Sequence, residues 1–125
     1  MRRLFLTVLT LGALAGALTS CASPAGVGAP IDLHPDAVII DVRTPAEQAA
    51  GHLDGALLLD VTGGELAAAL PELDRDAEYL VYCRSGSRAA AAIDMMTEAG
   101  FTDLTNLGSL ESAASATGLS VIVGD

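Results

Sequence analysis

The sequence is short of several kinds of residue, and each shortage narrows what the protein can be. Its 125 residues include no lysine and no tryptophan, and aromatic residues make up 3% of the chain. Six arginines stand against 16 acidic residues, for a formal net charge of -10. Such a chain cannot replace the counterions around phosphates, so nucleic acid is not an expected partner. With so few aromatic residues the core is expected to be aliphatic, and the length allows one small domain.

Reactive and metal-binding side chains are also few. The chain has two cysteines, Cys21 and Cys83, and two histidines, His34 and His52. One thiol and two histidines that are far apart in the sequence do not provide the ligands of a zinc site. The sequence therefore predicts no metal site and no cofactor.

No apolar run is long enough to span a membrane. The longest, Leu4 to Leu18, has 15 residues and is interrupted by two glycines, whereas a transmembrane helix needs about 20. Arg2 and Arg3 precede this run and the small residues of "LTSC" follow it, which is the order of a signal peptide. We predict a signal peptide at residues 1–20 and an exported chain. A transmembrane anchor is the alternative interpretation.

The stretch "LTSC" also resembles a bacterial lipoprotein box, in which the cysteine becomes the lipid-modified first residue of the mature chain. The resemblance implies lipidation of Cys21 and anchoring to the cell membrane on its periplasmic or outer face. Residues 21–36 are rich in alanine, glycine and proline, which predicts a flexible tether. The folded domain is expected over residues 37–125, with Ile31 and Leu33 docking at its edge.

From residue 37 onward, short apolar runs alternate with helical patterns. A capping box of Thr44 and Glu47, with Pro45 between them, marks the start of one helix. Alternating strands and helices predict an α/β fold with a small parallel sheet flanked by helices on both faces. Strands are predicted at 37–42, 56–61, 78–83, 101–107 and 119–123, of which the first two are expected to be buried. Helices are predicted at 44–50, 64–73, 87–100 and 109–118, and a turn at 51–56.

The stretch "YCRSGSR", residues 82–88, carries the strongest chemical signal. Cys83 ends a predicted strand and precedes a predicted helix, which is where ligands bind in parallel sheets. Backbone N–H groups around Gly86 can form an anion-binding nest, and the helix N-terminus adds positive potential. Arg84 and Arg88 favour the thiolate in the same direction. These features predict a reactive cysteine, although free cysteines are often inert core residues.

Three stretches resemble motifs of the single-domain rhodaneses. "DVRTPAEQAAGHLDGA" (41–56) resembles D-V-R-x-x-x-E-aromatic-x-x-G-H-I-x-G-A, "VYCRSGSRA" (81–89) resembles the active loop C-R-S-G-x-R, and "NLGSLE" (106–111) resembles N-L-x-G-G. Gln48 replaces the usual aromatic residue and Ser109 replaces a glycine. The resemblance implies a rhodanese-like fold over about Ile31 to Val123.

The resemblance also implies a function, which is sulfur transfer by a rhodanese-type enzyme. Cys83 would take the outer sulfur of a small donor anion such as thiosulfate, form a persulfide, and pass the sulfur to a thiol or to cyanide. Asp41 and Arg43 are expected to form a supporting ion pair, and His52 is expected to be structural. The donor-binding groups implied by the active loop are Arg84, Ser85, Gly86, Ser87 and Arg88, with Arg88 alternatively bracing the loop.

Three other functions remain possible at this stage. Cysteine-dependent phosphatases use the longer spacing C-x5-R, whereas Cys83 and Arg88 are spaced C-x4-R. A membrane-tethered sulfur carrier or protein-binding module could use the same loop with slow turnover or none, because the negative surface repels small anions. A thiol redox sensor would be oxidised at Cys83 without accepting sulfur.

Overall fold

The computed structural model describes residues 30–124. The predicted signal peptide, the predicted lipidation site Cys21 and most of the predicted tether lie outside the described residues. Within the described part, no helix is both long and apolar enough to cross a bilayer.

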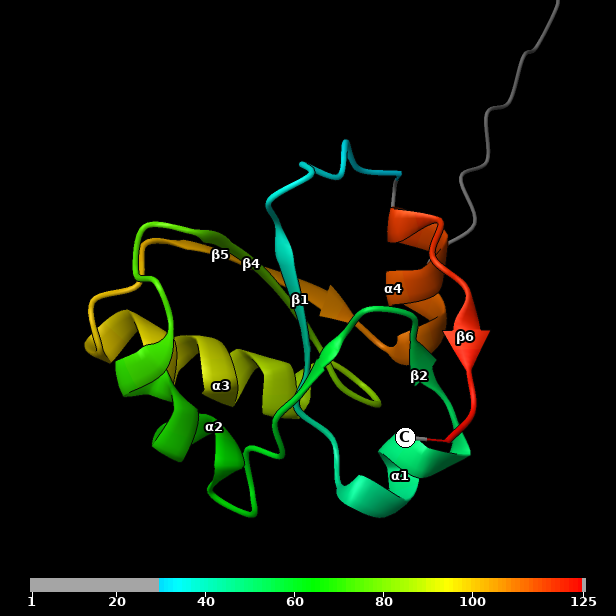
Figure 1. The fold of residues 1–125 in the computed structure, drawn as a ribbon, viewed down its shortest axis with the longest axis horizontal. Coiled ribbons are helices and arrows are strands. Elements are labelled where there is room, and N and C mark those ends of the chain that lie inside the picture. The colour runs from blue at the N-terminus through cyan, green and yellow to red at the C-terminus, as the bar shows by residue number, and fades with distance from the viewer. Residues whose placement is uncertain (1–29, 125) are drawn as a thin grey trace, which may run out of the picture.

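The centre of the domain is a four-stranded parallel sheet with the strand order β3-β1-β4-β5 (Figure 1). The two central strands, β1 (Val38–Asp41) and β4 (Glu78–Tyr82), are mostly buried. The edge strands are β3 (Leu57–Leu58) and β5 (Asp103–Gly108). The predicted α/β fold with a small parallel sheet is confirmed.

Alternate residues of β4 face two separate cores. Tyr79 and Val81 pack with the helix α2 (Glu65–Ala69), the 3-10 helix η1 (Leu70–Glu72) and α3 (Ser87–Glu98) on one face. Leu80 and Tyr82 pack with α4 (Leu110–Thr117) on the other face. The period of two along the strand therefore places helices on both faces of the sheet, as the sequence predicts.

The helix α1 (Pro45–Ala50) follows β1 and begins as predicted. Thr44 is its N-cap, the Thr44 side chain accepts a hydrogen bond from the Glu47 amide, and the Glu47 carboxylate accepts one from the Thr44 amide. This reciprocal capping box fixes the start of the helix directly beyond the carboxyl end of β1.

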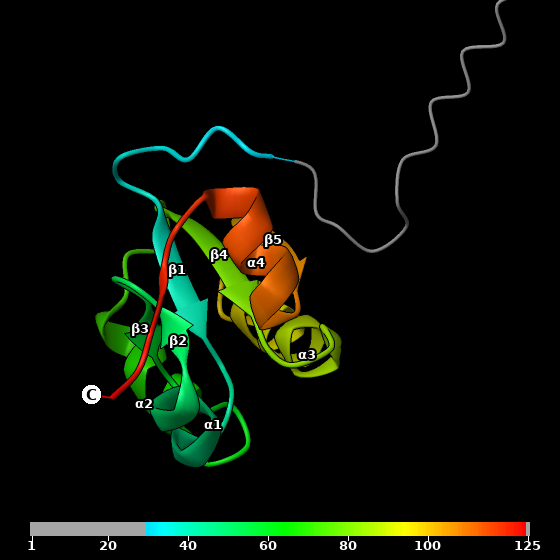
Figure 2. The ribbon, with the colours of Figure 1, turned by 90° about the vertical axis from the view of Figure 1, so that its right-hand side faces the viewer.

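The last predicted strand does not join the parallel sheet. Instead, β6 (Val121–Ile122) pairs antiparallel with β2 (His52–Leu53), and Figure 2 shows these two segments side by side. The predicted turn at 51–56 thus contains a short strand. β2 also contacts α4, so residues 52–53 lie beside the helix that precedes β6.

The strand predicted at 56–61 is shorter and more exposed than expected. Only Leu57–Leu58 are β3, which lies at the sheet edge, and Leu57 is 38% exposed. Beyond β3 the chain still runs along β1, since the Leu59 amide donates to the Asp41 carbonyl at 2.9 Å. The apolar run indicated a strand but could not show that it has a neighbour on one side only.

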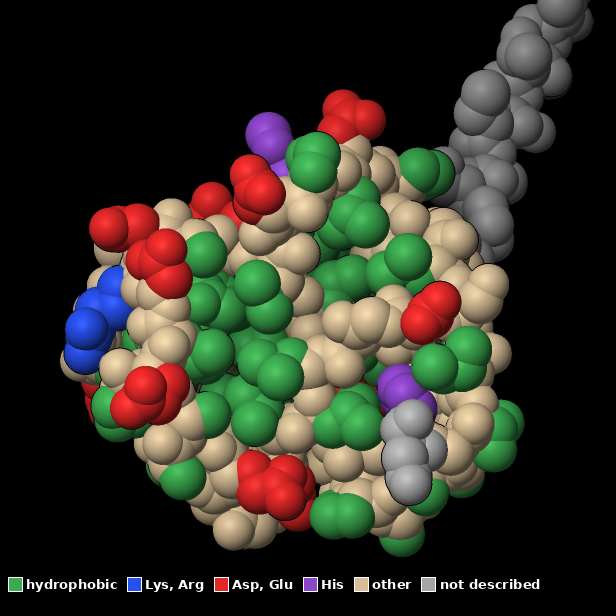
Figure 3. Space-filling view, in the orientation of Figure 1, with side chains coloured by type: hydrophobic (Ala, Val, Ile, Leu, Met, Phe, Trp, Pro, Cys, Tyr) green, Lys and Arg blue, Asp and Glu red, His purple; other side chains and the backbone are tan. Residues whose placement is uncertain are grey.

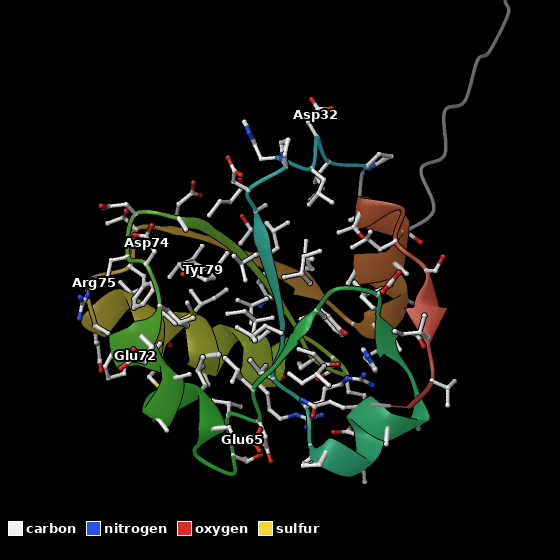
Figure 4. All side chains as sticks on the ribbon, viewed as in Figure 1. Asp32, Glu65, Glu72, Asp74, Arg75 and Tyr79 are labelled. Carbon is white, nitrogen blue, oxygen red and sulfur yellow. The ribbon has the colours of Figure 1, made fainter. Side chains whose placement is uncertain are left out.

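The core is mainly aliphatic, as expected, but three aromatic side chains also lie in it. Tyr79, Tyr82 and Phe101 are the largest fully buried side chains. Tyr79 lies between the sheet and α3, as Figure 4 shows, and its ring meets the Phe101 ring edge to face at 5.5 Å. The three aromatic residues of the described part of the chain are thus all buried.

The segment before β1 docks on the domain, as predicted for Ile31 and Leu33. Both side chains pack against the α4 core, and the Ile31 amide donates to the Ala116 carbonyl at 3.0 Å. Figure 2 shows this segment crossing one end of the domain from β1 towards α4.

Candidate active site

Cys83 lies directly after β4, at the carboxyl end of the sheet. Its backbone amide donates to the Gly108 carbonyl at 3.0 Å, which extends the pairing between β4 and β5 by one residue. The residue has no exposed surface, while Arg84, Ser85 and Ser87 in the following loop are exposed. The sulfur therefore lies beneath the loop that sequence analysis identified.

Backbone N–H groups of this loop and of the first turn of α3 point at the sulfur. The Gly86 amide donates to Cys83 Sγ at 2.9 Å. Burial raises the pKa of the Cys83 thiol, but hydrogen bonds from the amides of Ala89, Ser85, Gly86 and Arg88 outweigh it, so the pKa lies below its ordinary value. The arrangement favours a thiolate without a neighbouring general base.

Gly86 has the backbone conformation that this arrangement needs. It is the N-cap of α3, with φ of 94°, a region that other residues adopt at a cost. The Asn106 side chain donates to the Gly86 carbonyl at 3.0 Å and accepts from the Gly108 amide at 2.9 Å. The "NLGSLE" stretch, which contains Asn106, thus supports the loop from the end of β5.

Arg88 does not point freely into the loop. Its Nη1 and Nη2 atoms donate to Glu47 Oε2 and Oε1 at 2.7 and 3.0 Å. The same Glu47 carboxylate accepts from the amide and hydroxyl of Thr44, each at 3.0 Å. The hydrogen bond from Arg88 and those from Thr44 outweigh partial burial and lower the pKa of Glu47 to about 2. The structure thus favours the bracing role that sequence analysis gave as the alternative for Arg88.

Two further charged groups surround the loop. Arg84 is exposed and has no hydrogen-bond or ion-pair partner among residues 30–124. Asp60, in contrast, lies near enough to Arg88 for the two charges to interact. The pKa of Asp60 is lowered, chiefly because the Thr62 hydroxyl donates to its carboxylate at 2.8 Å.

A buried polar network supports the loop from the other side. Arg43 Nη2 donates to Asp41 Oδ2 at 2.7 Å, so the ion pair predicted from the sequence is present. The Tyr82 hydroxyl donates to the same carboxylate oxygen at 2.8 Å and accepts from the Leu53 amide at 3.0 Å. The network joins β1, β4 and β2 through Tyr82, the residue directly before Cys83.

Gln48, which replaces an aromatic residue of the motif, belongs to this network. Its Nε2 atom donates to the carbonyl oxygens of Arg43 and Asp41 at 2.9 and 3.2 Å. The Gln48 carbonyl lies 2.9 Å from His52 Nδ1. His52 is buried and contacts backbone rather than the sulfur, which agrees with its predicted structural role.

Glu47 and Asp60 are the charged residues beside the loop that sequence reasoning missed. The capping box accounted for the Glu47 carboxylate, and nothing in the local sequence showed that it also pairs with Arg88, 41 residues away. The available signal for this pairing was Arg88 of the C-x4-R loop, an arginine with no evident partner in the local sequence. Within the described residues, no group of three or more histidine, cysteine or acidic side chains is placed to hold a metal ion.

A buried cysteine whose sulfur is surrounded by backbone amides that favour the thiolate, at the carboxyl end of a parallel α/β sheet, is the arrangement of a class of proteins with a loop-activated cysteine. The protein-family model for the rhodanese-like domain matches residues 28–115 of this chain. The chain therefore belongs to the rhodanese-like domain family.

Curated relatives include several sulfurtransferases. "Thiosulfate sulfurtransferase PspE" of Escherichia coli is 31% identical over 77 residues, covering 60% of this chain and 72% of PspE. A "Sulfurtransferase" of Allochromatium vinosum is 33% identical over 72 residues, covering 58% of this chain and 65% of that protein. "Probable adenylyltransferase/sulfurtransferase MoeZ" of Mycobacterium tuberculosis is 42% identical over 72 residues, but the chain spans only 18% of its length.

Solved structures of the family share the fold. A structure described as rhodanese with anions from E. coli has a TM-score of 0.59 and 26% identity, covering 70% of this chain and 99% of that one. A rhodanese-like domain protein from Staphylococcus aureus has a TM-score of 0.56 and 26% identity, covering 67% of this chain and 79% of that one. These likenesses show that the chain has the fold of the rhodanese-like domain.

Proposed function

We propose that the protein transfers a sulfane sulfur from a small anionic donor such as thiosulfate to a thiophilic acceptor, through a persulfide on Cys83. The observation that carries the proposal is the set of backbone amides directed at the Cys83 sulfur, with the Gly86 amide at 2.9 Å. A low-pKa thiolate is the form that attacks a donor, and fixed N–H dipoles stabilise the anion before and after transfer.

The proposed reaction has two steps. The Cys83 thiolate attacks the outer sulfur of thiosulfate, a new S–S bond forms, and the old S–S bond breaks as sulfite leaves with its electron pair. The persulfide anion then remains among the same amides. An acceptor such as cyanide attacks the terminal sulfur, which leaves as thiocyanate and restores the Cys83 thiolate.

The burial of Cys83 suits an intermediate that must be kept from water. The sulfur has no exposed surface, so the donor has to enter past the exposed residues Arg84, Ser85 and Ser87. Arg84 has no partner among the described residues and is the charged side chain available to meet an entering anion.

A steady-state assay with thiosulfate and cyanide tests this proposal. We expect thiocyanate formation that is lost in Cys83→Ser and retained in the matched variant Cys21→Ser, which removes the other cysteine. Equal turnover by the wild type and Cys83→Ser would contradict the proposal.

The zero exposure of Cys83, together with the net charge of -10, favours a second candidate, a sulfur carrier that exchanges sulfur with a protein partner. This function predicts that Cys83 accepts one sulfur from a donor but releases little thiocyanate. Transfer from the loaded protein to a protein thiol, faster than transfer to cyanide, would support it.

We also propose that the protein is exported and lipid-anchored through Cys21. The support is the resemblance of "LTSC" to a lipoprotein box after a charged and then apolar segment. Cys21→Ser is expected to move the protein from the membrane fraction to the soluble fraction, and an unchanged distribution would contradict the anchor.

A further inference from the structure

Two arginines, Arg84 and Arg88, follow Cys83 in the loop, and they differ in whether an acid pairs with them. Arg84 is exposed and has no partner in the described part of the chain. Arg88 is held by both oxygens of Glu47, in a pair whose side chains are 27% and 29% exposed. Arg88, whose own amide contacts the sulfur, is therefore neutralised by an acid that remains in contact with solvent.

The geometry keeps this neutralisation in place. The Glu47 carboxylate accepts hydrogen bonds from the amide and hydroxyl of Thr44, so it is fixed at the N-terminus of α1 before it meets Arg88. Arg88 is fixed in turn by its place in the first turn of α3, where its own amide donates to Cys83. Glu47 therefore belongs to the folded framework and is not a mobile surface acid.

We propose that Glu47 is a specificity-determining residue, which neutralises Arg88 and so lowers the preference of the site for doubly charged donors over donors with less charge. This inference rests on the proposed sulfur transfer. Donors approach a site that already holds one anion, the Cys83 thiolate, and each further negative charge on the donor adds repulsion. Removing the Glu47 charge would leave Arg88, like Arg84, without an ion-pair partner.

Two donors that differ mainly in charge allow a direct comparison. Thiosulfate is a dianion and releases sulfite, while methanethiosulfonate is a monoanion and releases methanesulfinate. In both reactions the thiolate attacks the terminal sulfur, the S–S bond of the donor breaks, and the same persulfide is left on Cys83. The ratio of kcat/KM for the two donors thus reports how the site responds to donor charge.

Glu47→Gln keeps the size of the side chain and an oxygen that can still accept from Thr44, but it removes the charge. We expect this variant to raise the thiosulfate to methanethiosulfonate ratio by about three- to tenfold, which is the Coulomb effect of one charge within ~10 Å of the reacting atoms at a partly solvated site. A merely structural role for Glu47 would lower kcat/KM for both donors and leave the ratio unchanged.

Alkylation of Cys83 gives a second readout that does not depend on sulfur transfer. Iodoacetate and iodoacetamide react with a thiolate in the same way, but only iodoacetate is an anion. The ratio of the iodoacetate rate to the iodoacetamide rate does not depend on the fraction of thiolate present. We expect this ratio to rise in Glu47→Gln by a similar factor. A Cys21→Ser background leaves Cys83 as the one thiol of the chain.

Three matched variants serve as controls. Glu47→Asp keeps the charge and is expected to keep the wild-type ratios, whereas a purely steric role would make it resemble Glu47→Gln. Glu98→Gln removes the same charge at the far end of α3, about 15 Å from Arg88 along the helix axis, and is expected to leave the ratios unchanged. Asp60→Asn removes the other acid near Arg88 and should shift the ratios in the same direction, even where Glu47→Gln folds poorly.

The two assays separate this inference from the proposed function. Unchanged ratios in Glu47→Gln, with activity retained, would overturn the role of Glu47 alone. A raised alkylation ratio in a chain that forms no persulfide from either donor would support the charge role and overturn sulfur transfer. No reaction of Cys83 with any of the four reagents would overturn both.

Discussion

At the scale of single residues, the site depends on backbone amides more than on charged side chains. Arg88 is paired with Glu47, while the amides of Ser85, Gly86, Arg88 and Ala89 meet the sulfur. Sequence reasoning could predict the loop because glycine beside a strand end and a helix start is a local signal. It could not predict the Ala89 amide, which was outside the expected set, because only the path of the helix brings that group to the sulfur.

Gly86→Ala tests the amide arrangement. Alanine at Gly86 would be strained by the φ of 94°, with its Cβ 3.4 Å from Gly108 Cα, and relief of this strain is expected to move the Gly86 amide away from the sulfur. We expect a loss of about 1–2 kcal/mol in unfolding free energy and a higher thiol pKa, because the thiolate loses a donor. As the pKa rises, the thiolate fraction at neutral pH falls, and the alkylation rate measured against pH should show a higher midpoint.

Gly64→Ala is the matched control for this substitution. Gly64 has φ of 85° and is also the N-cap of a helix, but a Cβ there meets nothing within 4 Å. It should lose similar stability and leave the thiol midpoint unchanged. Equal midpoints in both variants and the wild type would show that the Gly86 amide does not tune the thiol.

At the scale of elements, the sequence predicted the central strands, the helices and the capping box. The small antiparallel pair β2 and β6 was not predictable, because each strand has two residues and the pairing depends on where α4 ends. The role of Gln48 was hidden for a similar reason. Its amide fills a site defined by two backbone carbonyls, which no periodic pattern reveals.

The Tyr82 hydroxyl is the link between these elements. In Tyr82→Phe the Asp41 carboxylate loses a donor and the buried Leu53 amide loses its acceptor. We expect a loss of about 1–3 kcal/mol in urea unfolding. Tyr79→Phe is the control, because its hydroxyl meets only the Asp74 carbonyl in a partly buried position. A loss in Tyr82→Phe no larger than that in Tyr79→Phe would contradict the linking role.

At the scale of the whole molecule, 16 acidic residues outnumber six arginines, and several of the acids lie at the amino ends of the strands. Figure 3 shows acidic side chains spread over one face of the domain. At the amino ends of the strands, acidic residues surround a depression of ≈ 470 Å³, away from Cys83 at the carboxyl end. Its lining residues are His34, Asp36, Ala37, Asp74, Asp76, Ala77, Glu78 and Asp103. A small anion is therefore repelled at a distance and attracted only near the loop.

Ionic strength tests this balance. Salt screens the long-range repulsion more than the short-range contacts at a buried site. We expect kcat/KM for thiosulfate to rise by about twofold or more between ~0.01 M and ~0.1 M salt, with sodium chloride as the added electrolyte. A steady fall over this range would mean that attraction by Arg84 dominates the approach.

The most direct test of sulfur transfer through Cys83 is the intact mass of the protein after incubation with thiosulfate and removal of excess donor. The wild type should gain the mass of one sulfur atom, lose it again on addition of cyanide, and show neither change as Cys83→Ser. A wild-type mass that does not change, or an equal gain in Cys83→Ser, would contradict the account.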